Sequence, residues 1–193
     1  MLERPRDYKQ ELLDLGCDPN DLGTVTWNPA TRAVDVSGSV YLNGKGLTRL
    51  PFQFGKVGGG FVCDGNRLTS LDGAPRTVGG DFGCAHNRLT SLQGAPRTVG
   101  GGFGCSHNRL TNLQGAPREV GGIFGCEDNR LTSLDGCPRE VGGSFGCSTD
   151  GLVDVSALRG CKIKGWIYLL GPKAGQKRVT KLLRAQGFKG KII

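Results

Sequence analysis

Residues 80–100, GDFGCAHNRLTSLQGAPRTVG, are one unit of a repeat that decides the fold of this chain. The unit recurs every 21 residues, and many of its positions hold the same residue in successive copies. These positions are Cys63, Cys84, Cys105, Cys126 and Cys147; Phe61, Phe82, Phe103, Phe124 and Phe145; Asn66, Asn87, Asn108 and Asn129; Leu68, Leu89, Leu110 and Leu131; Leu71, Leu92, Leu113 and Leu134; and Pro75, Pro96, Pro117 and Pro138. Such a period is typical of stacked repeat architectures.

Weaker copies extend the repeat at both ends. Val40 and Leu42 take the Phe and Cys places before the regular copies, and Trp166 and Tyr168 are assigned to these places after them. The sequence therefore predicts seven rungs, centred near Tyr41, Val62, Gly83, Gly104, Gly125, Gly146 and Ile167. Seven strands stacked about 4.8 Å apart would form a slab roughly 29 Å long.

Each unit combines a short strand with turns. Phe82 and Cys84 alternate with small or polar residues, which is typical of a strand that buries one face. Asn87 follows the strand, and its amide both donates and accepts, so we expect it to bond to the backbone of neighbouring loops. Pro96 and the glycines around it predict a return path that is extended and turn-rich rather than helical.

The pattern Cys-x-x-Asn-x-Leu-x-x-Leu resembles the leucine-rich repeat. The short period is similar to the shortest bacterial class, and NRLTSLxGAPxxVGGxFxC is similar to arrays in uncharacterised bacteriophage-encoded proteins. The resemblance covers about residues 36–170. It implies a leucine-rich-repeat solenoid, β-rich with stacked short parallel strands and an extended convex side. The strand begins with Gly-Gly-x-Phe rather than leucine, which leaves its curvature open.

The chain divides into three parts by pattern. Residues 1–35 are expected to form an N-terminal cap, with a helix from Pro5 to Leu15 and a hairpin of Thr24–Trp27 with Ala33–Val36. Residues 36–171 are the repeat array. Residues 172–193 form a basic C-terminal cap or tail with an amphipathic helix over Ala174–Gln186, ending at Gly187.

Length and composition limit the class of protein. The chain has 193 residues, of which 34 are glycine and 37% are hydrophobic, so a single repeat unit is favoured over a layered enzyme core. It has no run of about 18 apolar residues, and Met1–Asp14 is charged, so neither a membrane span nor a secretory signal is expected. We therefore expect a cytoplasmic protein, in the host cytoplasm if it is phage-encoded, without a membrane partner.

The sequence predicts neither catalysis nor a metal or cofactor. Five of the eight cysteines occupy the inward strand position, where packing explains them. No Cys-x-x-Cys occurs, and His86 and His107 are the only histidines. Polar residues recur as columns, and none forms a separate catalytic group. The Val-Gly-Gly segments lack the ending of a phosphate loop, so we interpret them as turns.

The outward strand positions form the favoured binding surface. Its middle column is glycine in the regular repeats, which allows a partner to approach the backbone. The flanking columns vary, and drift at exposed sites explains this variation equally well. The candidate protein-binding residues are Tyr41, Val62, Asp64, Asp81, His86, His107, Ile123, Glu127 and Ile167.

Basic residues provide the alternative interpretation. The net charge is +8, and residues 155–193 contain ten Lys and Arg without any Asp or Glu. Two rows of arginine also follow the repeat: Arg67, Arg88, Arg109 and Arg130, then Arg76, Arg97, Arg118 and Arg139. The candidate anion-binding residues are Arg67, Arg88, Arg109, Arg130, Lys177, Arg178, Lys181 and Arg184.

The leading hypothesis is a non-enzymatic protein-binding scaffold. The family resemblance implies a phage accessory or counter-defence factor that acts on a bacterial host protein. The alternative is a nucleic-acid-binding module that uses the basic tail and the arginine rows. A third interpretation of the tail is a solvated terminal helix.

Overall fold

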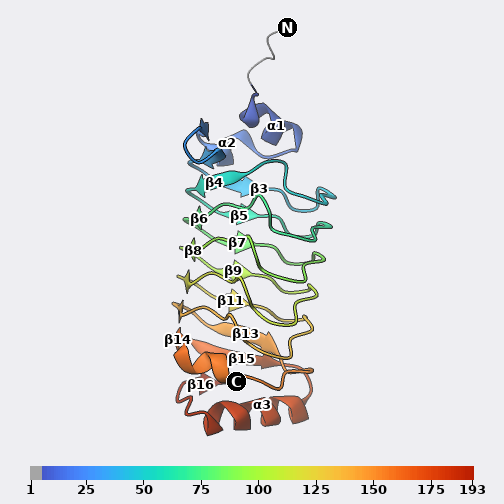
Figure 1. The fold of residues 1–193 in the computed structure, drawn as a ribbon, viewed down its shortest axis with the longest axis vertical. Coiled ribbons are helices and arrows are strands. Elements are labelled where there is room, and N and C mark those ends of the chain that lie inside the picture. The colour runs from blue at the N-terminus through green and yellow to red at the C-terminus, as the bar shows by residue number, and fades with distance from the viewer. Residues whose placement is uncertain (1–5) are drawn as a thin grey trace.

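The computed structural model describes residues 6–193, and it is built of stacked strands in two eight-stranded sheets (Figure 1). Within the regular part, each 21-residue unit contributes one strand to each sheet. All neighbouring strands are parallel except the first two in the chain. The chain is therefore β-rich with stacked parallel strands and a C-terminal helix, as the sequence predicts at this level.

Sheet 1 carries the Phe-x-Cys strands. In spatial order from the C-terminal end it contains β16 (Lys191–Ile192), β15 (Trp166–Leu170), β13 (Phe145–Ser148), β11 (Phe124–Gly125), β9 (Phe103–Gly104), β7 (Phe82–Gly83), β5 (Phe61–Val62) and β3 (Val40–Tyr41). Equivalent residues of successive repeats are paired, for example Phe82 with Phe103. Cys84 and Cys105 therefore lie on adjacent strands, which the predicted stacking requires.

Only the first two strands of sheet 2, which form the N-terminal hairpin, were predicted. Sheet 2 contains β1 (Val25–Asn28), β2 (Ala33–Val36), β4 (Phe54–Val57), β6 (Thr77–Val78), β8 (Thr98–Val99), β10 (Glu119–Val120), β12 (Glu140–Val141) and β14 (Lys162–Ile163). The later strands of sheet 2 occupy the segment for which the sequence predicts only an extended return path. β6, β8, β10 and β12 are each two residues long between proline and glycine, so they show no alternation that would identify a strand.

The core lies between the two sheets and consists of identical side chains stacked along the molecule. The five repeat phenylalanines are fully buried, with ring centroids 5.2–5.7 Å apart. The repeat cysteines, leucines and valines complete the core. The predicted inward position of phenyl and thiol groups is confirmed.

The asparagines connect adjacent turns. Asn108 Oδ1 accepts from the backbone N of Leu89 in the preceding repeat at 2.9 Å. Its Nδ2 donates to the carbonyls of Cys84, Cys105 and Ser106 at 2.9–3.3 Å. Asn66, Asn87 and Asn129 repeat this pattern. The predicted bonding of these amides to neighbouring loops is confirmed, and it satisfies backbone groups that the tight turn leaves unpaired.

The N-terminal elements are close to expectation. α1 (Tyr8–Asp14) is the expected helix, and Gly16 follows it at a φ of 76°; of the expected range, Pro5 lies outside the described residues. A short helix, α2 (Pro19–Leu22), was not predicted. The hairpin β1–β2 is present and antiparallel, as predicted.

The C-terminal end is more extensive than the sequence predicts. A 3₁₀ helix, η1 (Ser156–Gly160), precedes the last turn of the stack, and α3 (Lys173–Ala185) crosses the end of the molecule (Figure 1). Val179 and Leu183 of α3 are buried in the core. The chain then returns as β16, which pairs with β15.

The register of β15 corrects the expected last rung. Ile167 pairs with Phe145, a spacing of 22 residues, because the last unit contains one extra residue. Since neighbouring residues of a strand point to opposite faces, a shift of one position exchanges the two sets of side chains. Ile167 and Leu169 are therefore buried, whereas Trp166 and Tyr168 are exposed. The prediction of Ile167 as an exposed binding residue is wrong.

Candidate functional site

The outward face of sheet 1 carries a shallow depression of about 710 Å³. It runs across β5, β7, β9 and β11, and its floor is formed by the backbone of the glycine column. The structure brings five of the sequence-predicted residues to its lining: Val62, Asp64, Asp81, Ile123 and Glu127. We call this depression the sheet 1 groove.

The carboxylates of the groove are held by the sheet. Asp64 Oδ1 accepts from the backbone N of Ala85 at 2.7 Å, and Asp81 Oδ1 accepts from that of Gly102 at 2.6 Å. Glu127 Oε2 accepts from Ser106 Oγ. Partial burial raises the pKa of Asp64, although the bond from Ala85 opposes this effect. The groove therefore carries acidic groups whose positions are fixed by the sheet.

The glycine column is open at only one of its central positions. A methyl group built on Gly104 would meet no atom within 4 Å. On Gly83 it would meet the Asp64 carboxylate at 2.8 Å, and on Gly125 it would meet Glu127 at 3.0 Å. Two of the acidic side chains thus lie over neighbouring glycines, which the sequence did not predict. The backbone is most accessible at Gly104.

Apolar side chains lie along and beyond the groove. Ile123 is 61% exposed on its C-terminal side, and Val62 is half-buried on its N-terminal side. Tyr41, Trp166 and Tyr168 are exposed nearer the two ends of sheet 1. Trp166 also lies under the ammonium group of Lys191, 4.9 Å from the ring centroid. The aromatic residues at the C-terminal end were missed because the sequence does not reveal the extra residue.

The two histidines lie on a turn beside sheet 1. The rings of His86 and His107 stack with centroids 4.0 Å apart, and His107 Nε2 lies 3.3 Å from Asp128 Oδ2. All three residues have φ values of 51–54°, where glycine occupies the equivalent positions Gly44 and Gly65. Asp128 was missed. Its alignment with His107 in the repeat is the signal that identifies it.

The basic candidates fall into two groups. Arg67, Arg88, Arg109 and Arg130 are exposed, and within residues 6–193 none of them forms an ion pair. Arg178 instead donates to the carbonyls of Leu152 and Thr149, and Arg184 donates to those of Phe188 and Gly190. The Arg178 guanidinium therefore attaches α3 to the stack, and the Arg184 guanidinium holds the segment that follows the helix. The geometry does not support the assignment of these two residues as free ligands for anions. Lys177 and Lys181 are exposed.

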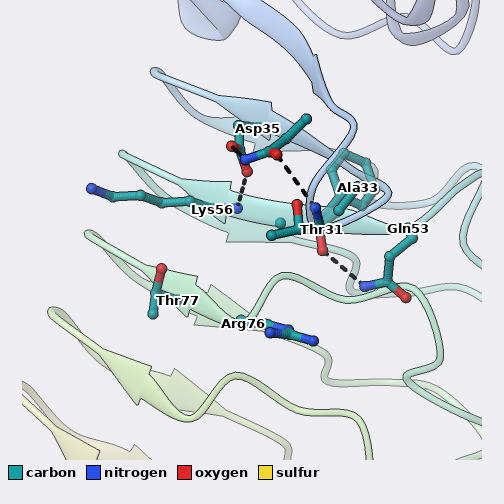
Figure 2. A pocket seen from close by; sticks show the side chains of 10 residues that line it. Thr31, Ala33, Asp35, Gln53, Lys56, Arg76 and Thr77 are labelled. Atoms are coloured by element: carbon teal, nitrogen blue, oxygen red, sulfur yellow. Dashed lines mark hydrogen bonds between the residues drawn. The ribbon is translucent and has the colours of Figure 1, made fainter.

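A second hollow of about 460 Å³ lies on sheet 2 near the N-terminal end. Figure 2 shows Asp35, Lys56 and Arg76, which come from β2, β4 and the residue before β6. Asp35 already accepts from Asn28 Nδ2 and from the Lys56 backbone N, and Gln53 donates to the carbonyls of Phe54 and Ala74. These bonds fix the Asp35 carboxylate and the Gln53 amide, and the hollow is a second candidate site.

Among the described residues there is neither a metal-binding cluster nor a disulfide. In the part of the chain that the structure describes, no three His, Cys, Asp or Glu side chains are placed to hold a metal ion. All eight cysteines are free thiols. Burial raises the pKa of the five repeat cysteines, to about 12 for Cys147.

None of the helices in residues 6–193 has the length and apolar character needed to cross a membrane. Comparison with protein-family models, with curated proteins and with solved structures found no match to this chain.

Proposed function

We propose that this chain is a leucine-rich-repeat solenoid that works as a non-enzymatic protein-binding scaffold, with the sheet 1 groove as its binding surface. The observation that carries the proposal is the groove itself. Its open backbone at Gly104 lies between the exposed Ile123 and the fixed carboxylates of Asp64 and Asp81. An apolar anchor beside oriented charges is an arrangement typical of protein recognition.

The chemistry of the groove defines the partner. Asp64, Asp81 and Glu127 favour a basic segment, and the exposed backbone requires that segment to lie flat against the sheet. The resemblance of the repeats to phage-encoded arrays supports a bacterial host protein as the partner. The chain would then act as an accessory or counter-defence factor in the host cytoplasm.

The test places a bulky side chain in the groove. Gly104→Tyr has room to fold, and tyrosine already occupies this column at Tyr41 and Tyr168. Thr98→Tyr adds the same ring at the exposed residue of β8 in sheet 2 and is the matched control. The variants are compared by quantitative affinity capture from bacterial lysate. We expect a captured protein that is retained by wild type and Thr98→Tyr and lost with Gly104→Tyr. Equal capture by all three would overturn the proposal.

Nucleic-acid binding remains the second candidate because the Arg67, Arg88, Arg109 and Arg130 row is exposed and outside any ion pair in residues 6–193. Phosphate contacts predict an affinity that falls steeply with salt. Two double variants distinguish binding by the basic tail from binding by the arginine row. Lys177→Glu/Lys181→Glu alters the tail, and Arg88→Glu/Arg109→Glu alters the row. A mobility-shift assay with duplex and single-stranded DNA at low and physiological salt measures both. Absence of a shift at micromolar protein would eliminate this candidate.

A further inference from the structure

Cys137 and Cys161 are two cysteines outside the buried repeat column. Each closes the same type of turn, because the backbone N of Cys137 donates to Leu134 O and that of Cys161 donates to Leu158 O. The equivalent turns of the earlier repeats close in the same way at Ala74, Ala95 and Ala116. Cysteine thus replaces alanine at this turn in the last two units only.

The pairing of sheet 2 brings the two cysteines together. Glu140 of β12 pairs with Lys162 of β14, and the backbone N of Lys162 donates to Arg139 O at 2.8 Å. Cys161 directly precedes Lys162, and Cys137 lies three residues before Glu140. A hydrogen bond between the two thiols lowers the pKa of Cys137 and raises that of Cys161. The register places Cys161 opposite Arg139, two residues after Cys137, so the two thiols lie near each other on adjacent turns of the stack.

The repeat cysteines provide an internal contrast. They also lie on adjacent strands, but Cys63, Cys84, Cys105 and Cys126 are fully buried. The thiols of Cys63, Cys105 and Cys126 donate to carbonyls of the next repeat. Desolvation raises their pKa values, which suppresses the reactive thiolate. Cys137 is only partly buried, and its pKa is displaced in the opposite direction.

We propose that Cys137 and Cys161 form a thiol–disulfide redox site that covalently links the last two units of the stack when it is oxidised. The oxidant is a small-molecule disulfide such as oxidised glutathione. The Cys137 thiolate attacks one sulfur of this disulfide and releases one glutathione thiolate, which takes up a proton. The bond to Cys137 that raises the Cys161 pKa is lost once Cys137 carries glutathione, so Cys161 then loses its proton to solvent. The Cys161 thiolate attacks the Cys137 sulfur and releases the second glutathione as a thiolate, which takes up a proton. Two protein thiols are oxidised and one glutathione disulfide is reduced.

A disulfide between Cys137 and Cys161 would stabilise the C-terminal end of the stack because of where it lies. The segment between the two cysteines contains η1 and the irregular turn at Thr149–Leu152, to which Arg178 of α3 donates. A covalent link across a loop of this length restricts the unfolded chain and is expected to raise the Tm by roughly 10 °C. Oxidation would therefore fix the C-terminal end of the stack and the helix that covers it.

The test incubates the full chain with oxidised glutathione and locates disulfides by peptide mass mapping without reduction. We expect one intramolecular disulfide, between Cys137 and Cys161, and a higher Tm that reverts on reduction. Cys161→Ala should instead retain a glutathione adduct on Cys137. Both Cys137→Ala and Cys161→Ala place at this turn the residue that three earlier repeats already carry, so we expect them to fold.

Cys84→Ala is the matched control, and it should still form the Cys137–Cys161 disulfide. Three results would each overturn the proposal: mapping of the disulfide to repeat cysteines, a stable adduct on Cys137 in wild type with no intramolecular bond, or unmodified thiols at both positions. Circular dichroism of every variant before oxidation verifies that the compared proteins are folded. The outcome is independent of the proposed partner, because no binding is measured.

Discussion

At the scale of single residues, each repeat contains side chains that stabilise the fold and others that recur from repeat to repeat without contributing to stability. Asn108 is buried and makes four hydrogen bonds to the backbone of two repeats. Arg109, its neighbour, is exposed. Adjacent positions of one turn therefore differ sharply in what they contribute to stability.

Asn108→Ala should lower the free energy of unfolding by about 1–3 kcal/mol, because it leaves buried backbone groups without partners. Arg109→Ala should change it by less than about 0.5 kcal/mol. Urea denaturation of the two variants beside wild type measures the difference. Equal midpoints would contradict the assignment of these side chains to the inside and the outside of the turn.

The ionisation of Asp64 should make the stability of the protein depend on pH. A raised pKa means that the folded state binds the proton more tightly than the unfolded state, so ionised Asp64 costs stability above its folded pKa. Asp64→Asn keeps an acceptor for Ala85 and removes this cost.

We expect Asp64→Asn to be at least as stable as wild type at pH 7, by no more than about 1 kcal/mol. Its advantage should shrink as the pH falls through the raised pKa and wild-type Asp64 becomes neutral. Thermal unfolding of both proteins between pH 7 and pH 4 tests this. A stability difference that widens toward acid would show that the sign is wrong.

At the scale of elements, the sequence predicts sheet 1 but only the N-terminal hairpin of sheet 2. Phe82 and Cys84 alternate with small residues, so the period of two is visible, and the amide of Asn87 indicates its turn. Thr98 and Val99 are too few to show any period, and flanking glycines suggest a loop. The register of β15 is predicted wrongly for a different reason. Trp166 and Ile167 are both apolar, so their composition does not indicate which of them faces the core.

The candidate site shows the same division. The outward columns follow directly from the strand pattern, which is why the sequence identifies Asp81, Ile123 and Glu127. The positions of Asp64 over Gly83 and of Glu127 over Gly125 depend on side-chain rotation, which the repeat does not encode. Arg178 is basic and on a helix, but only the position of the Thr149 and Leu152 carbonyls shows that it binds the fold.

Two glycines four residues apart, Gly100 and Gly104, test how closely the backbones of successive units approach. A methyl group on Gly100 would overlap the carbonyl oxygen of Gly79 in the preceding unit, whereas Gly104 has free space. Gly100→Ala should therefore destabilise the protein by about 1–3 kcal/mol, and Gly104→Ala should be neutral or stabilising by up to about 1 kcal/mol. Thermal unfolding of the pair measures both effects. Similar losses in the two variants would mean that the units are not stacked in this register.

At the scale of the whole molecule, each unit of the stack contacts mainly its neighbours, so the first and last units need capping elements to bury their apolar surfaces. α1 and the β1–β2 hairpin lie at one end, and α3 with β16 lies at the other (Figure 1). Because Val179 and Leu183 are core residues, removal of residues 172–193 would uncover apolar surface as well as remove positive charge. Charge reversal at Lys177 and Lys181 is therefore the cleaner way to examine the tail.

Arg178→Ala should weaken the attachment of α3 to the stack, because two backbone carbonyls lose a charged donor. We expect the free energy of unfolding to fall by about 2 kcal/mol. Lys177→Ala, the exposed neighbour, should stay within about 0.5 kcal/mol of wild type. Hydrogen exchange of the α3 amides and the Tm report the two effects. Unchanged exchange in Arg178→Ala would show that its guanidinium does not attach the helix.

The in-register pairing of identical residues has an evolutionary consequence. Recombination between two copies of the coding sequence that are offset by one unit would delete or duplicate 21 codons. Without residues 85–105, for example, Cys84 would precede Ser106, and Phe82 would stack on Phe124 as it now does on Phe103. Such a product inherits both terminal segments unaltered, so selection can adjust the size of this molecule in steps of one strand spacing.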